Sequence, residues 1–146
     1  MTLPLNQQVT SLELSQKLKE LNVPQESLFY WGKLEYSDRG MVWELCEKGV
    51  ELITKDMVSA FSVAELGELL PFYIDKNGAV LTLEITKVED SIAKNWMIVY
   101  TTHYASRDEN MYSKVFIDNE ANCRAKMLIW LIENKHLDVT NLKKGE

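Results

Sequence analysis

The sequence contains few of the residues from which metal sites, disulfide frameworks and phosphate-binding loops are built. Its 146 residues include two cysteines, two histidines and six scattered glycines. Neither Cys46 nor Cys123 lies in a CxxC or Cys/His spacing, and no GxGxxG or Walker A pattern occurs. We therefore expect two reduced, unlinked thiols, no metal site and no cofactor.

Long apolar runs and an excess of basic residues are also absent. The longest apolar stretch, Met127 to Ile132, is far shorter than the roughly 20 residues that cross a bilayer. The N-terminal MTLPLNQQ lacks the basic and apolar regions of a signal peptide. Sixteen Lys and Arg against twenty-two Asp and Glu give a formal net charge of -6, which disfavours nucleic acid as a partner. These features predict a cytoplasmic protein that contacts no membrane.

The remaining composition is typical of one folded domain. Hydrophobic residues make up 46% of the chain and charged residues 26%, close to globular averages. A chain of this length buries roughly 68–70% of its unfolded surface, which is enough for one core. Because no repeat, linker or low-complexity segment interrupts it, we expect a single α+β domain over 1–146.

Capping signals predict a first helix over 10–22. Thr10 is the expected N-cap, with Glu13 three residues later as in a capping box. Asn22 can adopt the left-handed conformation that ends helices.

The same signals predict a second, shorter helix over 62–70. Ser62 is the expected N-cap and Glu65 closes the box. Gly67, inside this helix, costs about 1 kcal/mol relative to alanine, so we expect it to pack closely against a neighbouring backbone.

Alternating and aromatic segments predict strands at 28–36, 41–47, 79–88, 96–104 and 112–117, with a short additional strand at 50–53. The polar segment 37–40 joins the first two as a hairpin. Since turns rather than helices connect most strands, we expect one mixed, mostly antiparallel sheet of five or six strands, with a long C-terminal helix on one face.

The C-terminal helix, capped by Asp118 or Asn119, is apolar over an unusually wide arc. Its core stripe consists of Ala121, Ala125, Leu128, Ile129 and Ile132. Further apolar surface comes from Cys123, Met127, Trp130 and Leu131. A helix this apolar is either central to its own fold or shared with another chain. We expect the second set to form a homodimer interface; the alternative is that the hairpin at 28–47 covers it. The tail 136–146 is expected to fray.

Aromatic residues on the predicted strands supply weak candidates for a ligand site. The candidates are Trp31, Trp43, Tyr100, His103 and Arg107. Alternating aromatics on strands usually belong to a core, but rings lie on both faces of the strand at 28–36, and one face needs a helix, a partner or a ligand to cover it. His103 lies near acidic residues in the sequence, and a histidine paired with a carboxylate could act as a general base. It has no accompanying nucleophile, so we predict no catalytic residue.

Three segments resemble a family of small uncharacterised proteins carried by phages and prophages. They are SLEL…LKEL…QESLFYW within 11–31, SAFSVAELGELLP at 59–71 and ANCRAKMLIWLIEN at 121–134. The matching residues are helix caps and core stripes, and the family brings no established activity. The resemblance implies a mobile-element accessory protein in the cytoplasm of a bacterial host.

Together these observations predict a non-enzymatic binding protein that contacts a host or phage protein. An alternative is a small-ligand binder that sequesters a nucleotide-type signal in an aromatic pocket; a third possibility is an enzyme that uses His103. A pocket lined by Trp or Tyr with convergent Arg would favour the second function, and a flat apolar surface would favour the first.

Overall fold

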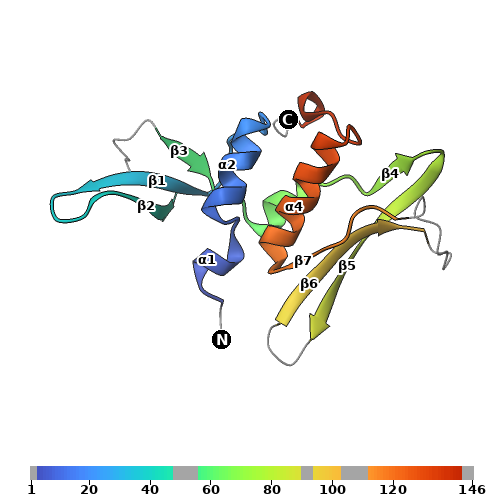
Figure 1. The fold of residues 1–146 in the computed structure, drawn as a ribbon, viewed down its shortest axis with the longest axis horizontal. Coiled ribbons are helices and arrows are strands. Elements are labelled where there is room, and N and C mark those ends of the chain that lie inside the picture. Colours follow the sequence, from blue (N-terminus) through green and yellow to red (C-terminus); the bar gives the residue numbers. More distant parts are fainter. Residues whose placement is uncertain (1–2, 48–55, 90–93, 103–111, 143–146) are drawn as a thin grey trace.

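Helices at the centre of the molecule separate two antiparallel β-sheets (Figure 1). The computed structural model describes residues 3–47, 56–89, 94–102 and 112–142. The helices are α1 (Leu5–Gln8), α2 (Leu12–Glu20), α3 (Val63–Leu69) and α4 (Glu120–Glu133). The strands are β1 (Phe29–Tyr36), β2 (Gly40–Glu47), β3 (Met57–Ser59), β4 (Tyr73–Lys76), β5 (Ala79–Glu89), β6 (Lys94–Thr101) and β7 (Phe116–Asp118). The predicted α+β class is confirmed. No helix in these ranges is long and apolar enough to span a membrane.

The strands form two sheets rather than the single sheet expected. One has the order β2-β1-β3 and is called the β arm; the other has the order β4-β5-β6-β7 and is called the core sheet. All neighbours are antiparallel. The chain leaves the β arm through β3, passes through α3 and only then enters β4, so α3 divides the sheets. The predicted strand at 50–53 lies outside the described residues.

The β arm is built around the predicted hairpin, which is confirmed. Its register runs from Phe29 opposite Glu47 to Tyr36 opposite Gly40. Gly40 has φ 70°, a left-handed conformation that glycine adopts without steric cost. The short strand β3 adds to the other side of β1.

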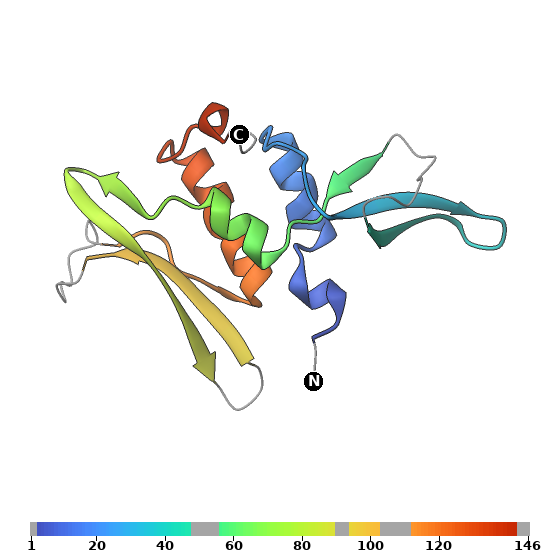
Figure 2. The ribbon, with the colours of Figure 1, turned by 180° about the vertical axis from the view of Figure 1, so that it is seen from behind.

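Helix α4 lies between the core sheet on one side and α2 and α3 on the other (Figures 1 and 2). Cys123, Met127 and Leu131 are 0% exposed and belong to the core. The prediction that these three residues form an exposed interface is therefore wrong. The alternative prediction, that the hairpin at 28–47 covers this helix, is also wrong, because the helices α2 and α3 pack on α4 instead.

The cap of α2 lies one residue later than predicted. Ser11 is the N-cap, and its side chain accepts a hydrogen bond from the Leu14 backbone N–H. Thr10 instead joins α2 to the segment before α3: it is 0% exposed, and its Oγ1 accepts a hydrogen bond from the Phe61 N–H at 3.0 Å. Because the Thr10 hydroxyl bonds to Phe61, a residue distant in sequence, it does not cap α2. The left-handed conformation of Asn22, at φ 63°, is as predicted.

The capping box of α3 is confirmed, with reciprocal hydrogen bonds between Ser62 and Glu65. Gly67 does pack closely, but its neighbour is a side chain rather than a backbone. A Cβ at this position would lie 2.9 Å from Nη1 of Arg124. This guanidinium also forms an ion pair with Glu120 at 2.9 Å, so Gly67 leaves room for an ion pair on α4.

The segment after α4 is ordered as far as it is described, whereas fraying was predicted for 136–146. The His136 ring stacks on Trp130, with the ring centroids 5.0 Å apart. A 3₁₀ turn follows at Val139–Asn141, and Leu142 is 7% exposed within the core. These contacts hold residues 136–142 against the domain.

Candidate functional site

The predicted ligand residues that the structure describes, Trp31, Trp43 and Tyr100, lie in separate places and have different neighbours. Tyr100 lies in the core sheet at 0% exposure, and its hydroxyl donates to the Pro71 carbonyl at 2.6 Å; burial raises the pKa of this phenol. Trp31 lies at the base of the β arm, where its Nε1–H donates to the Thr10 carbonyl at 2.9 Å. Trp43 lies further along the arm, with the Lys33 ammonium 5.9 Å from its ring centroid. His103 and Arg107 lie outside the described residues.

The two thiols are free, and they lie in different elements, Cys46 on β2 of the β arm and Cys123 on α4. Cys46 is half-buried on β2, and burial raises its pKa. Cys123 on α4 is buried, and its Sγ donates to the carbonyls of Trp96 and Phe116 at 3.0 and 3.2 Å. Burial raises the pKa of Cys123 to about 11. Neither environment produces the low-pKa thiolate of a nucleophilic cysteine.

In the native protein at pH 8, we expect Cys46 to react slowly with Ellman's reagent and Cys123 to react only after unfolding. A raised pKa reduces the thiolate fraction, so the rate at Cys46 should increase as the pH rises. Counting thiols with and without urea tests this. If no thiol reacted in urea because a disulfide joined Cys46 to Cys123, the prediction would be wrong. It would also be wrong if both cysteines reacted rapidly in the native protein.

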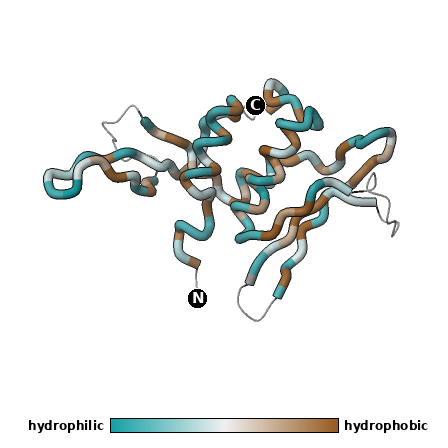
Figure 3. The backbone as a smooth tube through the Cα atoms, in the orientation of Figure 1, coloured by the Kyte–Doolittle hydropathy of each residue, from teal (hydrophilic) through white to brown (hydrophobic). Residues whose placement is uncertain are grey.

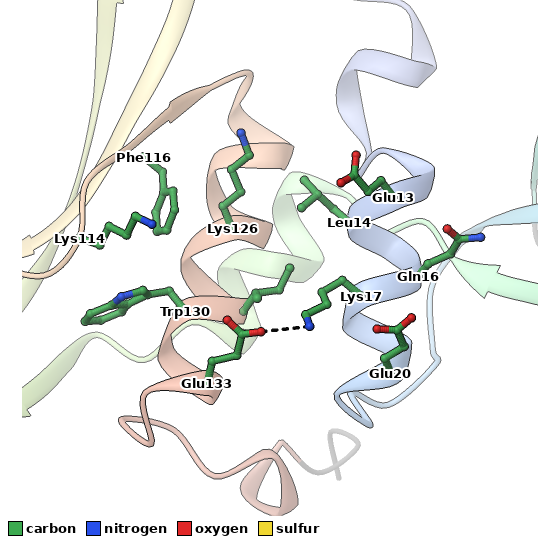
Figure 4. Close-up of a pocket in the computed structure, with 11 residues that line it drawn as sticks. Glu13, Leu14, Gln16, Lys17, Glu20, Lys114, Phe116, Lys126, Trp130 and Glu133 are labelled. Carbon is green, nitrogen blue, oxygen red and sulfur yellow. Dashed lines mark ion pairs between the residues drawn. The ribbon is translucent and has the colours of Figure 1, made fainter.

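The part of α4 that its neighbours leave open is the floor of a groove of about 470 Å³ (Figure 4). Lys126, Ile129, Trp130 and Glu133 of α4 line it at positions i, i+3, i+4 and i+7, so they share one helix face. One wall is α2, which contributes Glu13, Leu14, Gln16, Lys17 and Glu20; the other is the chain entering β7, which contributes Lys114 and Phe116. The groove therefore joins segments from both ends of the chain.

Apolar side chains form a strip along the floor of the groove and the adjoining parts of both walls. Leu14, Phe116 and Trp130 are partly buried and pack against the core, and Ile129 is 8% exposed. Of the four residues predicted to form an interface, Trp130 is the one at the surface. Its stacking on His136 limits the freedom of the indole, so less conformational entropy is lost when a partner covers it.

The charges around the groove are unevenly distributed. Lys17 of α2 pairs with Glu133 of α4 at 3.1 Å, and the two side chains are 44% and 45% exposed (Figure 4). An exposed pair of this kind contributes about 0–1 kcal/mol and opens readily. On the α2 wall, Glu13 and Glu20 make no ion pair with any other described residue.

Basic residues lie on the opposite wall, at Lys114, and on the neighbouring part of the floor, at Lys126. The Lys114 ammonium is 5.4 Å from the Phe116 ring centroid. Lys126 pairs with Asp118 at 2.7 Å. Glu13 and Glu20 thus lie on the α2 side of the groove, and the ammonium groups of Lys114 and Lys126 lie on the other side.

The titratable groups in the lining of the groove are carboxylates and ammonium groups. Its lining contains no histidine, cysteine or serine. Among the described residues, no group of three His, Cys, Asp or Glu side chains could hold a metal ion. What the groove offers chemically is apolar contact flanked by charge.

Compared with protein-family models, with curated proteins and with solved structures, the chain matches none of them. The function is therefore inferred from the surfaces of this chain.

Proposed function

We propose that the protein is a non-enzymatic binding protein that acts through protein–protein contact, with the groove over α4 as its recognition surface. The observation that supports this is Trp130: a large aromatic side chain at the surface of an apolar strip, on a face of α4 that lines the groove. Tryptophan is enriched among residues that dominate binding energy. The resemblance to phage and prophage proteins points to a host or phage protein as the partner.

The partner segment would be amphipathic, as in helices that bind in grooves. Its apolar residues would cover Leu14, Ile129 and Trp130. Basic residues on one flank would meet Glu13 and Glu20, and acidic residues on the other would meet Lys114 and Lys126. Displacement of Lys17 from Glu133 would cost little, since that pair is exposed.

Trp130→Ala should weaken partner binding by about thirty-fold, the equivalent of about 2 kcal/mol at a central aromatic anchor. Affinity capture from bacterial cells, with quantitative mass spectrometry, would identify the partner, and titration of the purified pair would measure the loss. Tyr73→Ala is the control, because Tyr73 is 64% exposed on β4 and lies outside the groove. A partner that binds both variants equally well would show that recognition occurs elsewhere.

A further inference from the structure

The β arm extends away from the helices and exposes the edge of β2 (Figures 1 and 2). All eight residues of β2 pair with β1. In the described part of the chain, β2 pairs with no other strand. A long open edge of this kind is a template for pairing with another strand.

Both faces of β2 carry apolar side chains that the core does not cover. Met41, Trp43 and Leu45 lie on one face, and Val42 and Cys46 lie on the other. Met41 is 49% exposed, and the other four are half-buried. None of these five residues belongs to the core cluster or packs against it. Apolar positions thus occur along the arm as well as around the helices (Figure 3).

The hydrogen bonds of the arm show which backbone groups point to the open edge. The Ala60 N–H donates to the Phe29 carbonyl at 2.9 Å, so the backbone groups of Phe29 point toward β3. Because these groups alternate in direction along a strand, those of Tyr30, Gly32 and Leu34 point toward β2. The residues opposite them on β2 are Cys46, Glu44 and Val42, whose backbone groups therefore point toward β1. The N–H and C=O groups of Met41, Trp43 and Leu45 therefore point outward.

We propose that two copies of this chain pair through their β2 edges, antiparallel and about a two-fold axis at Trp43. The two arms then form one continuous six-stranded sheet. An antiparallel edge can pair with itself, which is the requirement of a symmetric dimer. This surface shares no lining residue with the groove over α4.

Charge and side-chain matching favour this register over one centred on Glu44. With the two Trp43 residues opposite each other, Met41 lies opposite Leu45 of the second copy. At each end of the pairing, Glu47 lies beside the turn that carries Arg39 of the second copy, and these charges attract. Within its own chain, Arg39 makes an exposed ion pair with Asp38 at 3.7 Å and lies over the Tyr36 ring. A register centred on Glu44 would instead place two glutamates directly opposite each other, and like charges there are destabilising.

Sedimentation equilibrium of the purified full chain at tens of micromolar tests the proposal, and a dimer mass is expected. Leu45→Pro removes a backbone N–H that points outward and leaves the hydrogen bonds to β1 in place. Edge strands tolerate proline at such positions, so this variant should fold and be a monomer. Leu45→Val keeps that N–H and should remain a dimer. A monomeric wild-type protein at these concentrations would overturn the proposal. The proposal would also be overturned if β2 of this monomer paired with a strand of another protein.

A charge exchange tests the register even if Leu45→Pro does not fold. Arg39→Glu should weaken the dimer by about five-fold, since it sets two carboxylates opposite each other at both ends. Arg39→Glu combined with Glu47→Arg should restore the wild-type affinity. Within one chain, Arg39 and Glu47 lie at opposite ends of the hairpin, so an intrachain effect would not be rescued. A dimer that Arg39→Glu leaves unchanged, or that the double variant does not restore, would overturn the proposed register.

Discussion

Leu131→Ala should lower the free energy of unfolding by about 2–5 kcal/mol, the cost of truncating a buried leucine that its surroundings cannot replace. Leu131 is 0% exposed on α4, within the core that the core sheet, α2 and α3 share. Folded domains have about 5–15 kcal/mol of stability in total, so this single truncation removes a large fraction of it. Urea denaturation followed by far-UV circular dichroism measures the change.

Leu28→Ala is the matched control, because Leu28 is 61% exposed and contacts Glu65 through its backbone N–H. The same chemical change there should alter stability by less than about 0.5 kcal/mol. If Leu131→Ala instead left stability unchanged and altered the oligomeric mass, α4 would be an interface between chains, as its sequence suggests.

Glu65→Ala should destabilise the protein by about 2–3 kcal/mol, because charge-assisted hydrogen bonds contribute more than neutral ones. The Glu65 carboxylate accepts three hydrogen bonds: from the Ser62 N–H at 2.7 Å, from the Leu28 N–H at 2.9 Å and from the Ser27 hydroxyl at 3.0 Å. The Ser27 proton is shared with the Ala60 carbonyl, also at 3.0 Å. Glu65 therefore caps α3 and at the same time fixes the residues that enter β1. Its loss should also increase hydrogen exchange at the Leu28 amide.

Glu68→Ala is the control for this variant. Glu68 is exposed on the same helix, so the substitution removes one negative charge without removing these three bonds. A destabilisation by Glu65→Ala that does not exceed that of Glu68→Ala would show that the carboxylate is not needed at the junction of the arm and α3.

The features that the sequence predicts well are those decided within a few residues. The reciprocal cap of Ser62 and Glu65, the left-handed Asn22 and the hairpin around Gly40 all appear as expected. Each depends on hydrogen bonds or backbone angles of a short segment, which the local residue types determine. For the same reason, the strand-like alternation of 79–88 identifies β5 closely.

The features that it does not predict depend on contacts between distant segments. Thr10 has the sequence context of an N-cap, but Phe61 provides its partner. The width of the apolar arc on α4 shows that something covers the helix, but not whether a sheet, two helices or another chain does so. Strands β3 and β4 contain three and four residues, too few for a periodic pattern.

The groove was predictable only in part. Trp130 stands out as an aromatic residue beyond the core stripe of α4. Leu14 and Phe116 have no comparable signal, because they become neighbours of Trp130 only when both ends of the chain pack together. A polar or aromatic residue every third or fourth position along 126–133 marks the open face of α4, and this spacing could have pointed to the groove.

The contact between α2 and α4 also has a consequence for the order of events during synthesis. The Ser11 N–H donates to Oδ1 of Asn122 at 3.0 Å, a hydrogen bond between residues 111 positions apart. The β1–β2 hairpin can close as soon as residue 47 has left the ribosome, because its contacts are local. The core cannot close in this way, because α2 and the apolar face of the core sheet must wait for α4, the last α-helix of the described residues. Synthesis proceeds at about 5–20 residues per second. During that interval Leu18, Leu81 and Ile98 lack the α4 side chains of the core to which they belong, and they become fully buried only when α4 has joined the fold.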